Sequence, residues 1–126
     1  MKLLACGVML ILILISPDPT YAQSDEQDIR TLVAAQSQAS IDLASQIWQW
    51  AELGYQESQS SAALQNYLRD AGFEISPGVA DIPTAFVASF GRGGPSIGIL
   101  AEFDALPGLS QSAVPHRQTR IEDAPG

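Results

Sequence analysis

The first half of the chain carries apolar residues at helical spacing. From Ile29 onward they recur every three or four positions, which places them along one face of a helix. We expect a long amphipathic helix from about Ser24, whose hydroxyl can cap the first turn, to about Leu53. Gly54 is then the residue that ends this helix.

A second amphipathic segment follows over residues 58–71. Its apolar positions predict a helix with one inward face, formed by Ala62, Leu64, Tyr67, Leu68 and Ala71. Gly72 stands where helices commonly take a left-handed residue, and Phe73 can fold back onto the last turn. The sequence therefore predicts a glycine-terminated helix with a Schellman-type end.

After residue 73 the pattern changes to that of short strands. Residues 74–76, 84–90 and 96–103 are rich in apolar residues and are separated by Pro77-Gly78 and by Gly91-Arg92-Gly93-Gly94-Pro95. The short turn between the second and third segments predicts that they pair as an antiparallel hairpin. The third is apolar at nearly every position, so we expect it to be buried on both faces. The predicted fold class is α/β, with two amino-terminal helices and then a β-hairpin that enters a larger mixed sheet.

The amino terminus has the pattern of an export signal. Lys2 precedes an apolar run over residues 3–15, a Pro-rich break follows, and Thr20 and Ala22 are the small residues of a cleavage site. We expect residues 1–22 to be a signal peptide and the mature protein to be periplasmic or secreted. The run is shorter than the roughly 20 apolar residues that span a bilayer, so no stable anchor is expected after cleavage. A retained membrane anchor is the alternative interpretation.

Composition narrows the classes of partner and chemistry. The net charge is −8 and no basic stripe is present, which argues against nucleic-acid binding. Cys6, the single cysteine, lies in the predicted leader, so the mature chain would carry no disulfide and no thiol nucleophile. The glycine-rich turn lacks the lysine and the following helix of a phosphate loop, and no G-x-S-x-G motif occurs.

Two carboxylates end the third predicted strand. Glu102 and Asp104 are two residues apart, so in extended chain they point to the same face. In α/β proteins ligand sites form at this end of a strand. The pair is either hydrogen-bonded by neighbouring turn amides or balanced by cations, and spacing alone leaves both interpretations open. His116, the single histidine, lies in a polar loop and cannot build a metal site alone, so we expect it to be solvated.

The same segment carries a family resemblance. Glu102-Phe103-Asp104-Ala105-Leu106-Pro107 resembles the H-x-D-x-x-P segment of zinc-type amidohydrolases and exopeptidases that include the aminoacylases, with Glu in place of His. The chain most closely resembles the aminobenzoyl-glutamate hydrolase branch over about residues 47–126. Three further segments agree in order and spacing, namely Trp50-Ala51-Glu52-Leu53-Gly54-Tyr55-Gln56-Glu57, Pro83-Thr84-Ala85-Phe86-Val87-Ala88 and Ala124-Pro125-Gly126.

The resemblance implies roles for individual residues. Asp104 would accept the ring N–H of a metal-binding histidine and so orient it. Glu102, at the histidine position of other branches, is a weaker candidate for a metal ligand. In the family a segment like Ala124-Pro125-Gly126 leads into G-H-x-C-G-H, whose Cys and His bind the metals. Residues 23–126 would then be the amino-terminal part of a zinc-peptidase-like catalytic domain, truncated before the metal-ligand motif and binding no metal alone.

The implied activity is metal-dependent hydrolysis of an amide bond. The substrate class would be N-acyl amino acids, aminobenzoyl-glutamate or short peptides, and the full-length enzyme would use zinc or manganese and form a homodimer. This chain alone is expected to be inactive. The alternative from a different class is a non-catalytic exported binding module, or the decayed remnant of such an enzyme.

Overall fold

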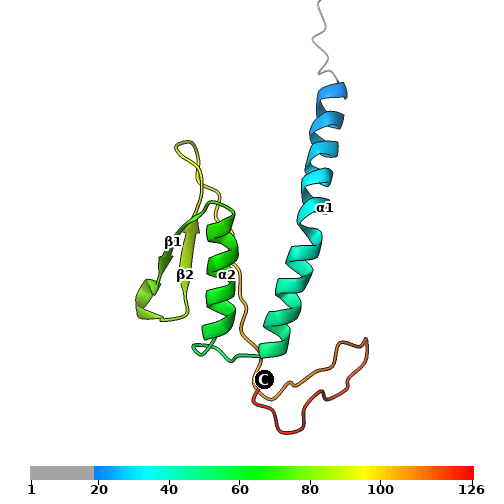
Figure 1. Ribbon diagram of the computed structural model, residues 1–126, viewed down its shortest axis with the longest axis vertical. Coiled ribbons are helices and arrows are strands. Elements are labelled where there is room, and N and C mark those ends of the chain that lie inside the picture. The colour runs from blue at the N-terminus through cyan, green and yellow to red at the C-terminus, as the bar shows by residue number, and fades with distance from the viewer. Residues whose placement is uncertain (1–18) are drawn as a thin grey trace, which may run out of the picture. The chain divides into compact units, whose positions relative to one another are not determined.

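The computed structural model describes residues 19–126, with side chains from residue 25 onward (Figure 1). The elements are helices α1 (Pro19–Trp50) and α2 (Ser58–Asp70), strand β1 (Glu74–Pro77), the short 3₁₀ helix η1 (Val79–Asp81) and strand β2 (Phe86–Ser89). The chain divides into two units within α1, between Gln36 and Ser37. The predicted leader run over residues 3–15 lies outside the described residues. Within the described part, no helix is both long enough and apolar enough to span a bilayer.

Helix α1 begins and ends earlier than the apolar pattern predicts. Pro19 is its first residue, a position that suits proline because its missing N–H would have no helical partner. The helix ends at Trp50, and Ala51, not Gly54, takes the left-handed conformation with φ of 48°. The prediction that Gly54 ends the helix is therefore wrong. The chain turns at Ala51 because residues 52–54 are held by contacts to distant parts of the sequence, described below.

The carboxyl-terminal end of α1 is capped from far along the chain. The last turn of the helix holds no basic residue of its own. Instead the Arg120 guanidinium donates to the carbonyls of Trp48 and Gln49, at 3.4 and 3.3 Å, and lies 4.3 Å from the centre of the Trp48 ring. A cation at this end satisfies unpaired carbonyls and complements the helix dipole.

Helix α2 confirms its predicted bounds to within one residue and its glycine-terminated end, but Ala62 and Ala71, which were expected to face inward, are exposed. It ends at Asp70, and Gly72 follows with φ of 90°. The Phe73 amide donates to the Leu68 carbonyl at 3.0 Å and the Gly72 amide donates to the Arg69 carbonyl at 2.9 Å. These two bonds are the pair that defines the Schellman motif. The fold-back also brings the Phe73 ring within 5.2 Å of the Phe90 ring.

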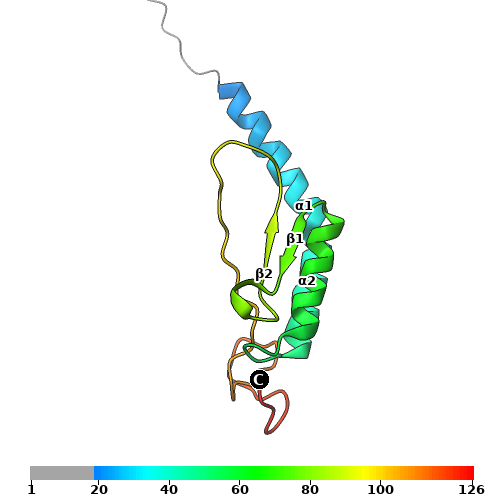
Figure 2. The same cartoon turned by 90° about the vertical axis from the view of Figure 1, so that its left-hand side faces the viewer.

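The strand pairing differs from the predicted hairpin. Strand β2 pairs antiparallel with β1, in a register that sets Glu74 opposite Ser89 and Pro77 opposite Phe86. The connection between them closes where the Gly78 amide donates to the Ala85 carbonyl at 2.8 Å. Figure 2 shows the chain after β2 turning back and running as extended coil. Residues 96–103 form no strand in the described structure, so their predicted pairing with β2 is wrong.

The apolar side chains of residues 97–100 face solvent. Ile97, Ile99 and Leu100 are 91%, 92% and 91% exposed, which contradicts the expected burial on both faces. The sheet that would cover this segment is absent from the described residues, whose only sheet has two strands. The two helices and the antiparallel pair are compatible with an α/β class, but the larger mixed sheet is not seen. No apolar side chain among the described residues is fully buried.

Candidate functional site

The most deeply buried side chains of the described structure are polar. Glu57, Ser60, Ser61 and Thr84 are 8%, 0%, 3% and 8% exposed, and we call this group the polar junction. It lies where the first turn of α2 meets the connection to β2. The Thr84 hydroxyl donates to Glu57 Oε2 at 2.6 Å, and the Ser61 hydroxyl donates to the Thr84 carbonyl at 2.6 Å. Since buried polar groups are costly unless they are paired, these bonds fix α2 against that connection.

Helix α2 is capped by a residue that lies well before it. Glu57 occupies the N-cap position but makes no side-chain cap bond. Glu52 does so instead: its Oε1 accepts from the Gln59 amide at 3.0 Å, and its Oε2 accepts from the Ser60 amide at 2.8 Å. Two of the amides that a helix start leaves unpaired are thereby satisfied by one carboxylate at the positive end of the dipole.

Both glutamates have a lowered pKa. Burial acts to raise the pKa of Glu52, but the bonds from the Gln59 and Ser60 amides outweigh it and hold the value below its ordinary 4.5. Burial likewise acts to raise the pKa of Glu57, as does the nearby charge of Glu52. The Thr84 hydroxyl and backbone amides outweigh both, so the pKa of Glu57 is also lowered. Each carboxyl is thus held in its charged form by hydrogen-bond donors.

These directions predict a loss of structure in acid. A lowered pKa in the folded state contributes stability above pH 4.5, and that stability is lost as the pH falls through the lowered value. We expect the start of α2 to loosen below pH 4.5, measured as faster amide exchange at Gln59 and Ser60. The double variant Glu52→Gln, Glu57→Gln should show less of this pH dependence. Equal protection of both amides on either side of pH 4.5 would contradict the assignment.

Removing the Thr84 hydroxyl should weaken the polar junction. In Thr84→Ala the Glu57 carboxylate stays buried and loses its side-chain donor, which should cost about 1–3 kcal/mol in the free energy of local opening at the start of α2. Amide exchange at Ser61, whose amide donates to the Glu57 carbonyl, measures this difference. Thr84→Ser is the matched control, because it keeps the hydroxyl and should keep the exchange rate of Ser61 near the wild-type value. A similar loss in both variants would assign the effect to packing instead.

Asp104 is held by the segment that joins the two helices. The Ala105 amide donates to the Glu52 carbonyl at 2.7 Å, and Leu53 and Ala105 form a parallel bridge. A Cβ added to Gly54 would lie 3.7 Å from Asp104 Oδ2 and 4.0 Å from Glu57 Oε1, so both carboxylates lie close to this glycine. The carboxylate of Asp104 is exposed at a fixed place beside the polar junction.

Glu102, like Asp104, is an exposed residue. Phe103 between them is half-buried, with its ring 6.2 Å from that of Phe86. This alternation is the one expected of extended chain, although no strand forms. In the described structure no hydrogen bond is formed by the Glu102 side chain, and the buried strand that was expected to carry the pair does not form.

The carboxyl-terminal segment packs against the same place. Gly126 is buried, and a Cβ on it would lie 2.7 Å from the Ala51 carbonyl oxygen and 2.9 Å from the Ala105 Cβ. The Pro125 carbonyl accepts from the Gly108 amide at 2.8 Å. The four segments that carry the family resemblance are therefore in contact with one another, although they are far apart in the sequence.

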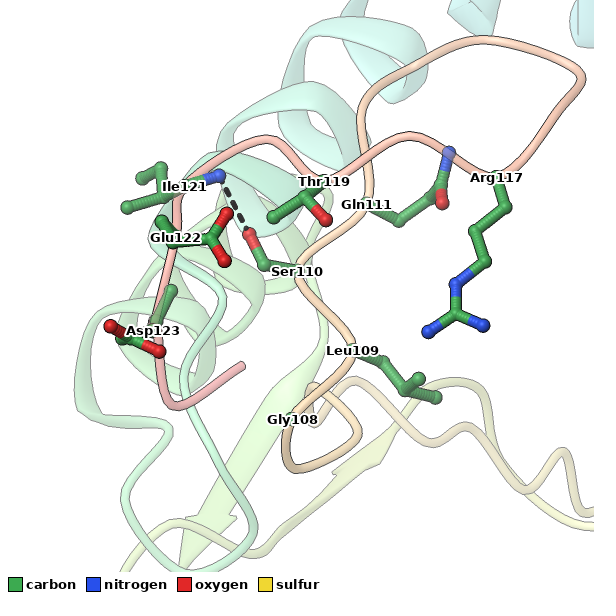
Figure 3. A pocket seen from close by; sticks show the side chains of 10 residues that line it. Gly108, Leu109, Ser110, Gln111, Arg117, Thr119, Ile121, Glu122 and Asp123 are labelled. Atoms are coloured by element: carbon green, nitrogen blue, oxygen red, sulfur yellow. Dashed lines mark hydrogen bonds between the residues drawn. The ribbon is translucent and has the colours of Figure 1, made fainter.

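His116 belongs to a separate loop that surrounds an open hollow of about 680 Å³ (Figure 3). Gln111 holds this loop together: its Nε2 donates to the carbonyls of Ser112 and His116, both at 2.9 Å, and its Oε1 accepts from the Gln118 amide at 3.1 Å. His116 is exposed and takes part through its backbone. The hollow is lined by Gly108, Leu109, Ser110, Gln111, Arg117, Thr119, Ile121, Glu122, Asp123 and Ala124.

The described residues do not assemble a metal site by themselves. No three His, Cys, Asp or Glu side chains among residues 25–126 lie together in a way that could hold an ion. Glu102, Asp104 and His116 are thus not brought together as a ligand set. Sequence reasoning did not find the roles of Glu52, Glu57 and Thr84. Their segments were identified only through the family resemblance. The Glu52 and Glu57 carboxylates accept hydrogen bonds from residues that lie seven or more positions away along the chain, Thr84 among them, so no local sequence pattern marks these roles.

The sequence of this chain is similar to part of a known hydrolase subunit. No protein-family model matches the chain. Over 81 residues the chain is 46% identical to one of the subunits of p-aminobenzoyl-glutamate hydrolase from Escherichia coli (strain K12). The match covers 64% of this chain and 17% of that protein, so the chain spans less than a fifth of its relative's length. The resemblance of this chain to the aminobenzoyl-glutamate hydrolase branch is confirmed by that similarity.

Proposed function

We propose that this chain forms one wall of the active site of an amidohydrolase of the aminobenzoyl-glutamate hydrolase type. The substrate would be aminobenzoyl-glutamate or a related amide, such as an N-acyl amino acid or a short peptide. One observation carries the proposal: residues 50–57 and Gly126 lie against the segment that bears the exposed carboxylate of Asp104. Residues 83–88 contact those segments through the Thr84–Glu57 hydrogen bond and the Phe86–Phe103 ring pair. The 46% identity to a protein named as such a hydrolase supports it independently.

Within this wall of the active site, Asp104 is the residue with a role in metal binding. Its carboxylate would accept the ring N–H of a histidine that binds zinc or manganese in the longer protein. In the family, the residues that follow a segment like Ala124-Pro125-Gly126 supply such ligands. Gly126 lies against Ala105, the residue after Asp104. A histidine that follows Gly126 in the longer protein would therefore enter close to the Asp104 carboxylate. The metal ligands of the proposed site would come from the longer protein, so we assign the described residues no step of hydrolysis and propose that the chain alone is inactive.

A graft tests this proposal. The matched 81 residues of this chain would replace their counterpart in the Escherichia coli relative, and hydrolysis of p-aminobenzoyl-glutamate would be followed by release of glutamate. We expect the graft to hydrolyse the substrate and the full chain alone to be inert. A soluble, metal-loaded graft without activity would contradict the proposal. Binding of p-aminobenzoyl-glutamate by the chain alone, together with an inert graft, would favour the non-catalytic binding module.

We further propose that the protein is exported and that the longer enzyme is a homodimer. The leader pattern predicts cleavage after Ala22, so the mature chain should begin at Gln23. Intact-mass measurement of the protein recovered from the cell envelope and from the medium tests this prediction. A mass that includes Met1, from protein in the inner membrane, would support the retained anchor instead.

A further inference from the structure

Glu52 connects two parts of the proposed site through different atoms of one residue. Its carboxylate accepts from the Gln59 and Ser60 amides at the start of α2, at 3.0 and 2.8 Å. Its backbone carbonyl accepts from the Ala105 amide at 2.7 Å. The residue after Asp104 and the first turn of α2 are therefore held at a fixed distance through Glu52.

The neighbours of Glu52 extend this connection to the Asp104 side chain. Leu53 continues the link to Ala105 as a parallel bridge. At Gly54 the lack of a Cβ leaves the Asp104 carboxylate close to the backbone. Asp104 is therefore positioned by residues 52–54 and not by a sheet, because the segment that bears it forms no strand.

The side chain of Glu52 is what fixes the path of this segment. Residues 51–57 lie between two helices and contain no helix or strand of their own apart from the Leu53 bridge. Without the carboxylate, the amides of Gln59 and Ser60 would need other acceptors, and residues 52–54 would have no side-chain hydrogen bond to α2. The carbonyl that holds Ala105 would then lose its fixed position.

We propose that Glu52 is a positioning residue for Asp104. This inference rests on the proposed function, in which Asp104 orients a metal-binding histidine. Glu52 does not touch substrate. It acts by holding the backbone of residues 52–54, which in turn positions the Asp104 carboxylate. Its loss should therefore lower turnover through Asp104 and leave the KM for substrate nearly unchanged.

The first arm of the test measures the connection itself, without any activity. Amide exchange is followed by NMR on the full chain, for wild type, Glu52→Ala and Glu74→Ala. Glu74 is an exposed carboxylate on β1, so its variant carries the same change of charge away from the site. We expect Glu52→Ala to speed exchange at Gln59, Ser60 and Ala105 together, and Glu74→Ala to change none of them. Faster exchange at the two helix amides alone would show that Glu52 is only a helix cap and would overturn the inference.

The second arm is a double-mutant cycle in the grafted hydrolase. Glu52→Ala should lower kcat by about 10-fold, the lower end of what a supporting residue of a metal site contributes. In an Asp104→Ala background the same change should cost less than about 2-fold, because its effect passes through Asp104. Glu52→Gln keeps one acceptor oxygen and should restore part of the activity.

The outcomes separate the two proposals. An unmutated graft that is loaded with metal and inert contradicts the proposed function, and the exchange arm still decides whether Glu52 holds Ala105. An active graft in which the losses of Glu52→Ala and Asp104→Ala multiply overturns the inference alone. That result would assign Glu52 a general structural role.

Discussion

Asp104→Ala should lower both the metal content and the turnover of the grafted hydrolase, whereas His116→Ala should change neither. Asp104 is anchored through the Leu53–Ala105 bridge, and its carboxylate is fixed beside Gly54. Losing a carboxylate that orients a metal ligand typically costs about 10–100-fold in affinity or activity. His116 lies exposed in the Gln111 loop, where a substitution typically changes stability by less than about 0.5 kcal/mol.

The measurement pairs bound zinc or manganese with the rate of p-aminobenzoyl-glutamate hydrolysis in the same samples. Asp104→Asn is the matched variant, because it keeps the size of the side chain and removes the charge. Glu102→Ala tests the weaker candidate for a metal ligand and should leave the metal content close to wild type. If His116→Ala loses the metal while Asp104→Ala keeps it, the proposed wall of the site is wrong.

What the sequence predicted well depends on residues close together in the chain. The end of α2 is set by bonds within six residues, so a glycine followed by an apolar residue was enough to predict its geometry. The half-buried Phe103 between the exposed Glu102 and Asp104 has the two-residue alternation of extended chain, although no strand forms.

What the sequence did not predict depends on distant partners. The end of α1 follows from contacts of residues 51–54 with Ala105 and Gly126, which outweigh the preference for a turn at Gly54. The pairing of β2 with β1 is closed by the Gly78–Ala85 bond, and the short glycine turn after β2 suggested the wrong partner. Since such contacts have no local signature, the polar junction and the anchor of Asp104 became visible only in three dimensions.

Residues 23–126 on their own should associate in solution through the exposed segment 96–103. Ile97, Ile99 and Leu100 are each more than nine-tenths exposed, and the extended backbone between them forms no ladder. Burying each such side chain contributes about 1.5–3 kcal/mol, and an unpaired apolar strand is a template for pairing with another chain. We expect sedimentation velocity to show oligomers that grow with concentration, and thermal unfolding to lack a sharp transition.

Ile99→Lys should shift this association to higher concentration, because a charged residue on an unpaired strand disfavours edge-to-edge pairing. Ile29→Lys is the matched control: Ile29 is also an exposed apolar residue, 60% accessible, but it belongs to α1 and not to the extended segment. If both lysine variants reduce association equally, general surface charge is the cause and segment 96–103 is not the contact. A monomer at high concentration with one cooperative transition would show instead that the two-stranded sheet and α2 form a self-sufficient fold, so that the exposed isoleucines need no further sheet to cover them.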